Sequence, residues 1–396
     1  AMQNDGPVDW KESLAIGRIP VRTNADGQLF VDKISDYESR PVDRWQKNAA
    51  YLVGGISDVE RRILQSNALS WSDRAAGAPT GLDTLHFFKT STEALDPTFK
   101  DSLQVALEAG LSWLTYFGHS AAQTWEIVTD PPATYNNPGK LPVILSLGCF
   151  TGDFATGNGS EADLRSFSEQ LVLDNLNGGI VHWGASSSGT IGASAALSDE
   201  VHTSIFTDTL RVIGEALRIA KGRFADRFSD PLSVKHLLQY GLIGDPATQL
   251  ALPVQPEFRM QPEQISIRPL APIPADSNLT VTVELENLGL TPADSVVFRA
   301  TRQRPDQGVD VQDLLVPPFG LQSEIEVLFP ITDDLVGEHA VVAEIDSDNR
   351  YEEGNELDNS AERSVNVFAT GISIITPPPY GLVDTTTPTL RVAVSR

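Results

Sequence analysis

Two residues capable of nucleophilic and acid–base chemistry follow short apolar segments of the chain. Residues 113–117 run through a glycine into His119, and residues 143–147 run through a glycine into Cys149, the only cysteine among 396 residues. A cysteine thiolate is a strong nucleophile, and a neighbouring imidazole can take up the thiol proton and deliver it to a leaving amine. The two residue types therefore predict covalent catalysis by a thiol, provided that the fold brings them together.

The pattern of the chain before residue 252 predicts a fold that does so. Five short apolar segments lack polar alternation, which indicates strands buried on both faces; they are residues 50–53, 85–88, 113–117, 143–147 and 179–183. Helical patterns alternate with them at residues 96–110, 160–171 and 199–221, and again from Pro231. We therefore expect an α/β domain with a mostly parallel sheet and helices on both faces. The carboxyl ends of neighbouring strands form a ligand crevice in such sheets, so His119 and Cys149 should face each other there.

The pattern changes at residues 252–258, a proline-containing segment that predicts a linker. Beyond it, Leu and Val alternate with polar residues between positions 279 and 285, which is typical of a strand with one buried face. Further short strands, at 325–327, 340–345 and 364–368, complete the pattern of an all-β immunoglobulin-like sandwich. We therefore divide the chain into an α/β domain at 1–252, a linker at 253–257, the sandwich at 258–368, and a tail or further module at 369–396.

The composition excludes several classes of partner. Asp and Glu number 53 against 29 Lys and Arg, giving a formal net charge of −24, which argues against nucleic acid. No apolar run approaches the ~20 residues that span a bilayer, so we expect no membrane insertion by this fragment. The chain begins with Ala1 and Met2, which look vector-derived, and it has no signal peptide. We therefore expect further domains in the same polypeptide.

Five segments resemble, in order, the catalytic region of gingipain-type cysteine peptidases, within the caspase-like group. They are residues 15–22, 114–119 with Trp125 six residues on, 149–154, 177–179 and 242–246. The resemblance implies that Cys149 is the nucleophile and His119 the general base and acid. It also implies that the backbone N–H groups of Ser120 and Cys149 hold the oxyanion, a task for which fixed donors need no reorganisation. Trp125 then lies near the substrate or packs the loop.

The chain departs from the family pattern in three places. Ser120 stands where the family usually has glycine, and its Cβ restricts the backbone. No acid directly follows the strand that ends at Val53, so Asp58 or Glu60 is the candidate for orienting the histidine. The family's first sub-domain is largely missing from residues 1–252, and we expect walls of the substrate site to be missing with it.

One acidic segment of the sandwich has residues typical of calcium ligation. Residues 346–359 resemble the acidic hairpin of adhesion-related, immunoglobulin-like bacterial surface domains. Carboxylate oxygens suit calcium, and the candidate ligands are Asp346, Asp348, Glu353 and Glu356, although their spacing fails the EF-hand pattern. A solvated acidic loop explains the same residues without a metal.

Together these observations predict a cysteine endopeptidase that is secreted by a bacterial cell or displayed on its surface. Its substrate would be a peptide or protein, with Arg or Lys before the cut bond as the resemblance suggests, and the thiol chemistry requires no cofactor. Two alternatives stay open. One is a non-catalytic adhesion module on a degenerate caspase-like scaffold, and the other is a sortase-like transpeptidase that passes its acyl group to an amine.

Overall fold

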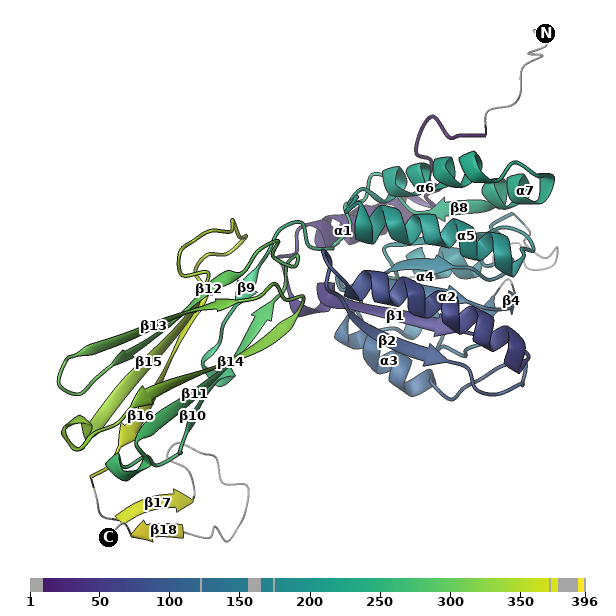
Figure 1. The fold of residues 1–396 in the computed structure, drawn as a ribbon. Helices are drawn as coiled ribbons and strands as arrows, with labels where there is room; N and C mark the ends of the chain where they lie inside the picture. Colours follow the sequence, from purple (N-terminus) through teal and green to yellow (C-terminus); the bar gives the residue numbers. More distant parts are fainter. Residues whose placement is uncertain are drawn as a thin grey trace. The chain divides into compact units, whose positions relative to one another are not determined.

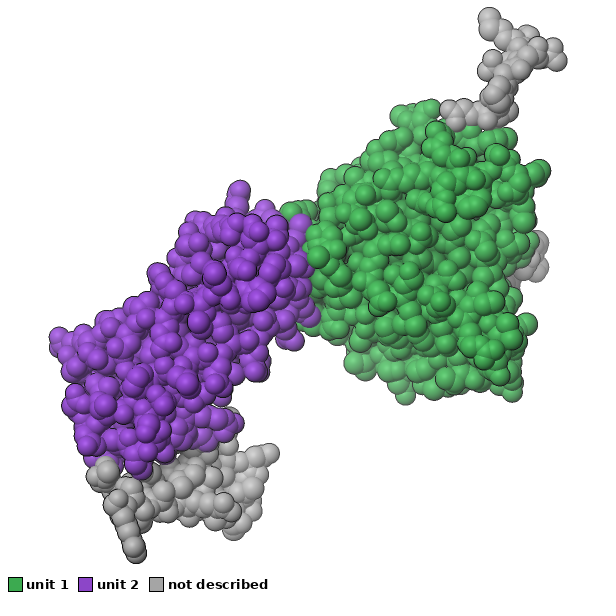
Figure 2. All heavy atoms as spheres, viewed as in Figure 1, with its two compact units in different colours: residues 1–254 green, residues 255–396 purple. Residues whose placement is uncertain are grey.

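The computed structural model describes residues 10–121, 123–155, 165–173 and 175–369, together with the backbone of residues 372–376 and 391–394. The chain forms two compact units, residues 1–254 and 255–396 (Figures 1 and 2). The division falls inside the segment predicted as a linker. Within the described residues, no helix combines the length and the apolar character needed to cross a membrane.

A six-stranded sheet forms the centre of the first unit, with strand order β2-β1-β3-β6-β7-β8. Neighbouring strands are parallel except that β8 runs antiparallel to β7. The strands are β1 (Asn48–Val53), β2 (Asp83–Phe88), β3 (Trp113–Phe117), β6 (Val143–Ser146), β7 (Val181–Ala185) and β8 (Tyr240–Ile243). Tyr51 and Val53 of β1 pack in one apolar core, whereas Leu52 packs in another. The sheet is therefore buried on both faces, as the lack of polar alternation predicts.

Helices cover both faces of this sheet. They are α1 (Asn24–Glu38), α2 (Asp58–Ala76), α3 (Lys100–Ala109), α4 (Phe167–Leu173), α5 (Ile191–His202), α6 (Ile213–Arg227) and α7 (Pro231–Gln239). One core joins the sheet to α2, α5, α6 and α7, and the core on the opposite face joins it to α3 and α4 (Figure 1). A smaller cluster packs α1 against α4 and β8. The predicted α/β architecture is confirmed.

The helix predicted at residues 199–221 is in fact two helices. The first, α5, ends at His202, a π-helical turn spans Thr203–Thr207, and α6 begins only at Ile213. Thr209 between them has a left-handed backbone with φ of 55°, which ends the right-handed helical path. Periodicity missed this break because apolar residues of both helices face the same core.

Two other helices begin later than predicted. The Asp96 carboxylate accepts the Thr98 N–H at 2.9 Å and holds a turn, so that α3 begins at Lys100. The helix predicted from residue 160 begins at Phe167 as α4, and its predicted capping segment lies outside the described residues.

The second unit is a sandwich of two antiparallel sheets. One contains β10 (Ile265–Arg268), β11 (Asn278–Asn287) and β14 (Gln322–Pro330), with β9 (Phe258–Arg259) also paired to β11. The other has the order β13-β12-β15-β16, formed by β12 (Val296–Gln303), β13 (Val309–Val316), β15 (Gly337–Ile345) and β16 (Ser360–Val367). One apolar core draws residues from both sheets, so they face each other as in an immunoglobulin-like domain.

The predicted tail is described only in part. The backbone of β17 (Ile372–Thr376) pairs antiparallel with β18 (Arg391–Val394). The rest of residues 370–396 lies outside the described residues, and the prediction of a further module is left open there.

Candidate active site

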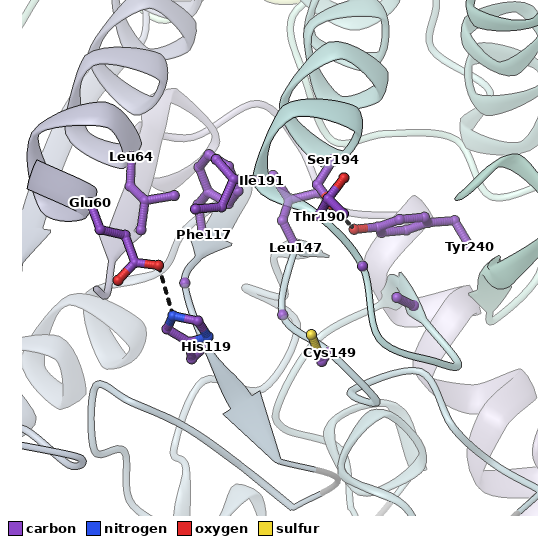
Figure 3. A pocket seen from close by; sticks show the side chains of 14 residues that line it. Glu60, Leu64, Phe117, His119, Leu147, Cys149, Thr190, Ile191, Ser194 and Tyr240 are labelled. Carbon is purple, nitrogen blue, oxygen red and sulfur yellow. Dashed lines mark hydrogen bonds and ion pairs between the residues drawn. The ribbon is translucent and has the colours of Figure 1, made fainter. Parts of the chain in front are cut away.

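His119 and Cys149 line one pocket at the carboxyl edge of the sheet (Figure 3). Their strands, β3 and β6, are parallel neighbours, and Tyr116 of β3 is paired in register with Ser146 of β6. The segments that follow the two strands therefore begin side by side at the same edge of the sheet. The pocket encloses about 50 Å³, and its other walls come from α2, α5, the loop before α5, and the facing ends of β7 and β8. The fold thus brings the two predicted catalytic residues to a common crevice.

Glu60 lies beside the His119 ring. Its Oε1 atom is 2.8 Å from His119 Nε2 (Figure 3). An ionised carboxylate can only accept hydrogen bonds, so this contact assigns the proton of a neutral His119 ring to Nε2 and leaves Nδ1 as the acceptor. The other carboxylate oxygen of Glu60 accepts the Ile56 N–H at 2.8 Å, which fixes the side chain at the start of α2. Asp58, the second candidate acid, pairs with Arg61 and is exposed.

The thiol and the imidazole are both accessible from the pocket. Cys149 is partly exposed, and 49% of the His119 side chain is exposed. Among the residues drawn in Figure 3, no hydrogen bond joins Cys149 to His119. Catalytic hydrogen bonds are often long in free enzymes and tighten when substrate binds. The arrangement therefore leaves both reactive groups open to a bound peptide.

A tight turn presents Cys149. Phe150 directly after it has a left-handed backbone with φ of 62°, which is uncommon for a residue with a bulky side chain and is found at functional sites. The Ser120 hydroxyl donates to the Cys149 carbonyl at 2.7 Å. A Cβ at position 148 would meet Ser120 Oγ at 2.2 Å, so Gly148 provides the space for this contact. Ser120, a departure from the family pattern, thus helps to hold the cysteine turn.

The hairpin after His119 leaves the Ser120 N–H available. It consists of β4 (Ser120–Ala121) and β5 (Thr124–Trp125), with Ser120 opposite Trp125. The neighbouring pair is hydrogen-bonded, since the Glu126 N–H donates to the His119 carbonyl at 3.3 Å. Bonded and non-bonded pairs alternate along an antiparallel ladder, so the Ser120 N–H points away from β5. The β4–β5 ladder therefore does not use the Ser120 N–H.

Glu126 is a structural element of the site that sequence reasoning missed. Its Oε2 accepts the backbone N–H groups of His119 at 3.0 Å and Gly55 at 2.6 Å. Its Oε1 lies 3.1 Å from Lys89 Nζ, and both side chains are at most 5% exposed. This buried ion pair ties together the chain segments that follow β1, β2 and β3. A Cβ on Gly54 would meet Glu126 Oε2 at 2.0 Å, so glycine at that strand end was the available sequence signal.

Two aromatic residues near the site, Trp125 and His182, are buried. Trp125 is 2% exposed, stacks on Tyr116 with ring centroids 4.9 Å apart, and donates from Nε1 to Ser146 Oγ at 2.9 Å. His182 on β7 is fully buried, and neither of its ring nitrogens has a hydrogen-bond partner within the described residues. Burial lowers the pKa of His182 to about 3, so its ring is neutral.

Two of the acidic side chains predicted as calcium ligands already accept hydrogen bonds from backbone N–H groups of the protein. The Asp346 carboxylate accepts the backbone N–H groups of Arg350 and Tyr351, and that of Glu353 accepts the Phe258 N–H. In the described part of the chain, no group of three or more His, Cys, Asp or Glu is placed to hold a metal ion. Calcium binding stays a prediction, which thermal melts in calcium and magnesium at matched ionic strength would test.

A mostly parallel sheet with a cysteine and a histidine in one pocket at its carboxyl edge is the arrangement of a caspase-like cysteine hydrolase. The model of peptidase family C25 matches residues 2–251, more than half of the chain. The chain therefore belongs to peptidase family C25 and is a cysteine-type peptidase, so its substrates are peptides or proteins. No curated protein sequence matches it.

Solved structures resemble each unit at low sequence identity. The Arg-specific cysteine proteinase gingipain R has 15% identity and a TM-score of 0.49, covering 91% of this chain and 77% of that one. A structure described as a protease has 12% identity and a TM-score of 0.51, covering 91% and 76%, which shows a shared fold. The CARDB domain of the PF1109 protein from Pyrococcus furiosus, in complex with di-metal ions, has 20% identity and a TM-score of 0.23, covering 29% and 96%.

Proposed function

We propose that the protein is an endopeptidase in which Cys149 attacks the peptide carbonyl and His119 transfers the protons. The observation that carries the proposal is the pocket shared by the two side chains, with Glu60 hydrogen-bonded to Nε2 of His119. That bond supports an orienting role for Glu60, because it fixes the ring and leaves Nδ1 as the atom that receives the thiol proton. The dyad thereby becomes a triad of thiol, imidazole and carboxylate.

The reaction proceeds through an acyl-enzyme. His119 Nδ1 takes the thiol proton while the sulfur adds to the carbonyl carbon, and the resulting oxyanion accepts hydrogen bonds from the Ser120 and Cys149 N–H groups. His119 then gives its proton to the amine nitrogen, the C–N bond breaks, and the acyl group remains on Cys149. A water molecule, deprotonated by the same imidazole, displaces the thiolate and releases the carboxylic acid.

A preference for Arg or Lys before the cut bond needs an acid near the substrate side chain. Among the described residues that line the Cys149 pocket, Glu60 is the only acid, and it is hydrogen-bonded to His119. Gingipain R is described as Arg-specific, and the same preference stays a prediction for this chain. Action outside a bacterial cell belongs to the same proposal.

Hydrolysis of a denatured protein by the purified full chain tests the proposal. Wild type should cleave it, and mass spectrometry of the products should locate the cut bonds. Cys149→Ser should be inactive, and His119→Ala should lose about 10²- to 10⁴-fold in rate, the usual contribution of general acid–base catalysis. Equal cleavage by wild type and Cys149→Ser would contradict the assignment of the nucleophile.

A further inference from the structure

A second pocket adjoins His119 on the side of β1 and β2. It encloses about 250 Å³, and its walls come from the segments after β1 and β2 and from the β4–β5 hairpin. His119 lines both this pocket and the one that contains Cys149. In the sheet, β3 lies between β1 and β6. Ile56, Ala94 and Leu95, which follow β1 and β2, line this second pocket and do not line the one that contains Cys149. The segment that carries His119 therefore lies between them and the cysteine turn after β6.

The walls of this second pocket are mostly apolar. Ile56 and Leu95 line it and are 55% and 51% exposed, so both present aliphatic surface to a group that enters the pocket. Trp125 forms a buried part of the lining. Among the described residues of the lining, Glu126 is the only acid, and its carboxylate is already bound by Lys89 and two backbone N–H groups. The pocket therefore suits an uncharged, apolar side chain.

The chemistry of the proposed reaction determines which part of a substrate reaches this pocket. The acyl half of the peptide stays attached to Cys149, whereas the amine half receives its proton from His119. The chain that follows the cut bond must therefore pass His119 and continue away from β6, toward the segments after β1 and β2. The volume lies below the ~300 Å³ at which sites for drug-sized ligands begin, so it accommodates one or a few side chains.

We propose that this pocket is the subsite for the residue directly after the cut bond and that it selects an apolar side chain. The proposal rests on the endopeptidase function argued above. It assigns Ile56 and Leu95 as specificity-determining residues, whereas Cys149, His119 and Glu60 perform the chemistry. Since apolar pockets discriminate through small differences in buried area, substrates with Leu or Phe after the cut bond should be favoured about 10- to 200-fold over those with Asp or Lys.

Peptides that differ only at the residue after the cut bond test this inference. Leu95→Lys should reverse the ranking of Leu against Asp by placing a cation in the pocket, measured as the ratio of their kcat/KM values. Val105→Lys is the matched control, because Val105 is a 65% exposed residue of α3 outside the residues that line the pocket. It should leave the wild-type ranking unchanged.

A reagent that occupies only the acyl side of the site, at Cys149, distinguishes failure of the subsite proposal from failure of the endopeptidase proposal. A peptidyl chloromethylketone has no residue after its reactive carbon, so it should modify Cys149 equally in wild type and Leu95→Lys. If Cys149 is labelled and the peptides with Leu, Phe, Asp and Lys after the cut bond are cleaved equally well, the subsite proposal is overturned and the peptidase proposal stands. Absence of both labelling and cleavage overturns the peptidase mechanism and the subsite with it.

Discussion

Removal of the Glu60 carboxylate should lower kcat/KM, and the size of the loss follows from the hydrogen bond between Glu60 and His119. In Glu60→Gln one carboxylate oxygen becomes an NH2 group. When the remaining oxygen accepts the His119 Nε2–H, a neutral acceptor replaces a charged one, and the Ile56 N–H loses the oxygen that accepts it at 2.8 Å in the wild type. Hydrogen bonds to charged groups contribute about 1.5–3 kcal/mol and neutral ones about 0.5–1.5 kcal/mol. The difference, about 1–1.5 kcal/mol, corresponds to roughly a five- to twelvefold lower kcat/KM. Because 49% of the His119 side chain is exposed, solvent screens the interaction, and we expect a loss near fivefold.

The assay is peptide hydrolysis, from which kcat/KM of each variant is determined. Glu60→Ala should lose more than Glu60→Gln, roughly 10- to 150-fold, because the whole charged hydrogen bond disappears. Asp58→Asn is the matched control: Asp58 is 79% exposed and pairs with Arg61 rather than His119, so its loss should be within about twofold. Full activity of Glu60→Ala, or an equal loss in Asp58→Asn, would refute the orienting role of Glu60.

Three further substitutions test other contacts. Glu126→Gln leaves Lys89 buried without a counter-charge and should destabilise the fold by about 3–5 kcal/mol in urea unfolding, and an added Lys89→Met should recover most of that loss. Ser120→Ala removes the 2.7 Å hydrogen bond to the Cys149 carbonyl and should lower kcat about two- to tenfold; an increase would contradict the supporting role. Burial raises the pKa of Glu353 to about 8, so the folded sandwich holds that proton more tightly and loses stability as pH rises toward 8; in thermal melts Glu353→Gln should flatten this dependence.

The sheet of the first unit could be predicted because its strands are buried on both faces. Such strands appear in the sequence as apolar runs, and β3 spans the residues predicted for it, whereas β7 begins two residues later than predicted. The sandwich was harder to predict strand by strand. Its edge strand β13 exposes Val309, Val311 and Leu315, so hydrophobic alternation there marks the solvent face rather than the core. Neither β12 nor β13 was predicted.

The candidate site was predictable only where local sequence determines it. His119 and Cys149 follow strand ends, and strand order alone brings them to one edge. The choice of Glu60 over Asp58 depends on how the segment after β1 enters α2, which no short motif specifies. The pairing of Glu126 with Lys89 joins residues 37 positions apart. Such tertiary contacts leave no periodic signal, so both helix breaks and buried ion pairs had to be found in the structure.

The most direct test of the central claim is the reactivity of Cys149 toward a peptidyl chloromethylketone. If His119 activates the thiol, mass spectrometry of the folded wild-type protein should find the label on Cys149, and His119→Ala should react at least about tenfold more slowly. Circular dichroism of the variant should confirm that it is folded. An unlabelled Cys149 in the folded wild-type protein, or equal labelling rates in wild type and His119→Ala, would contradict the proposed catalytic pair.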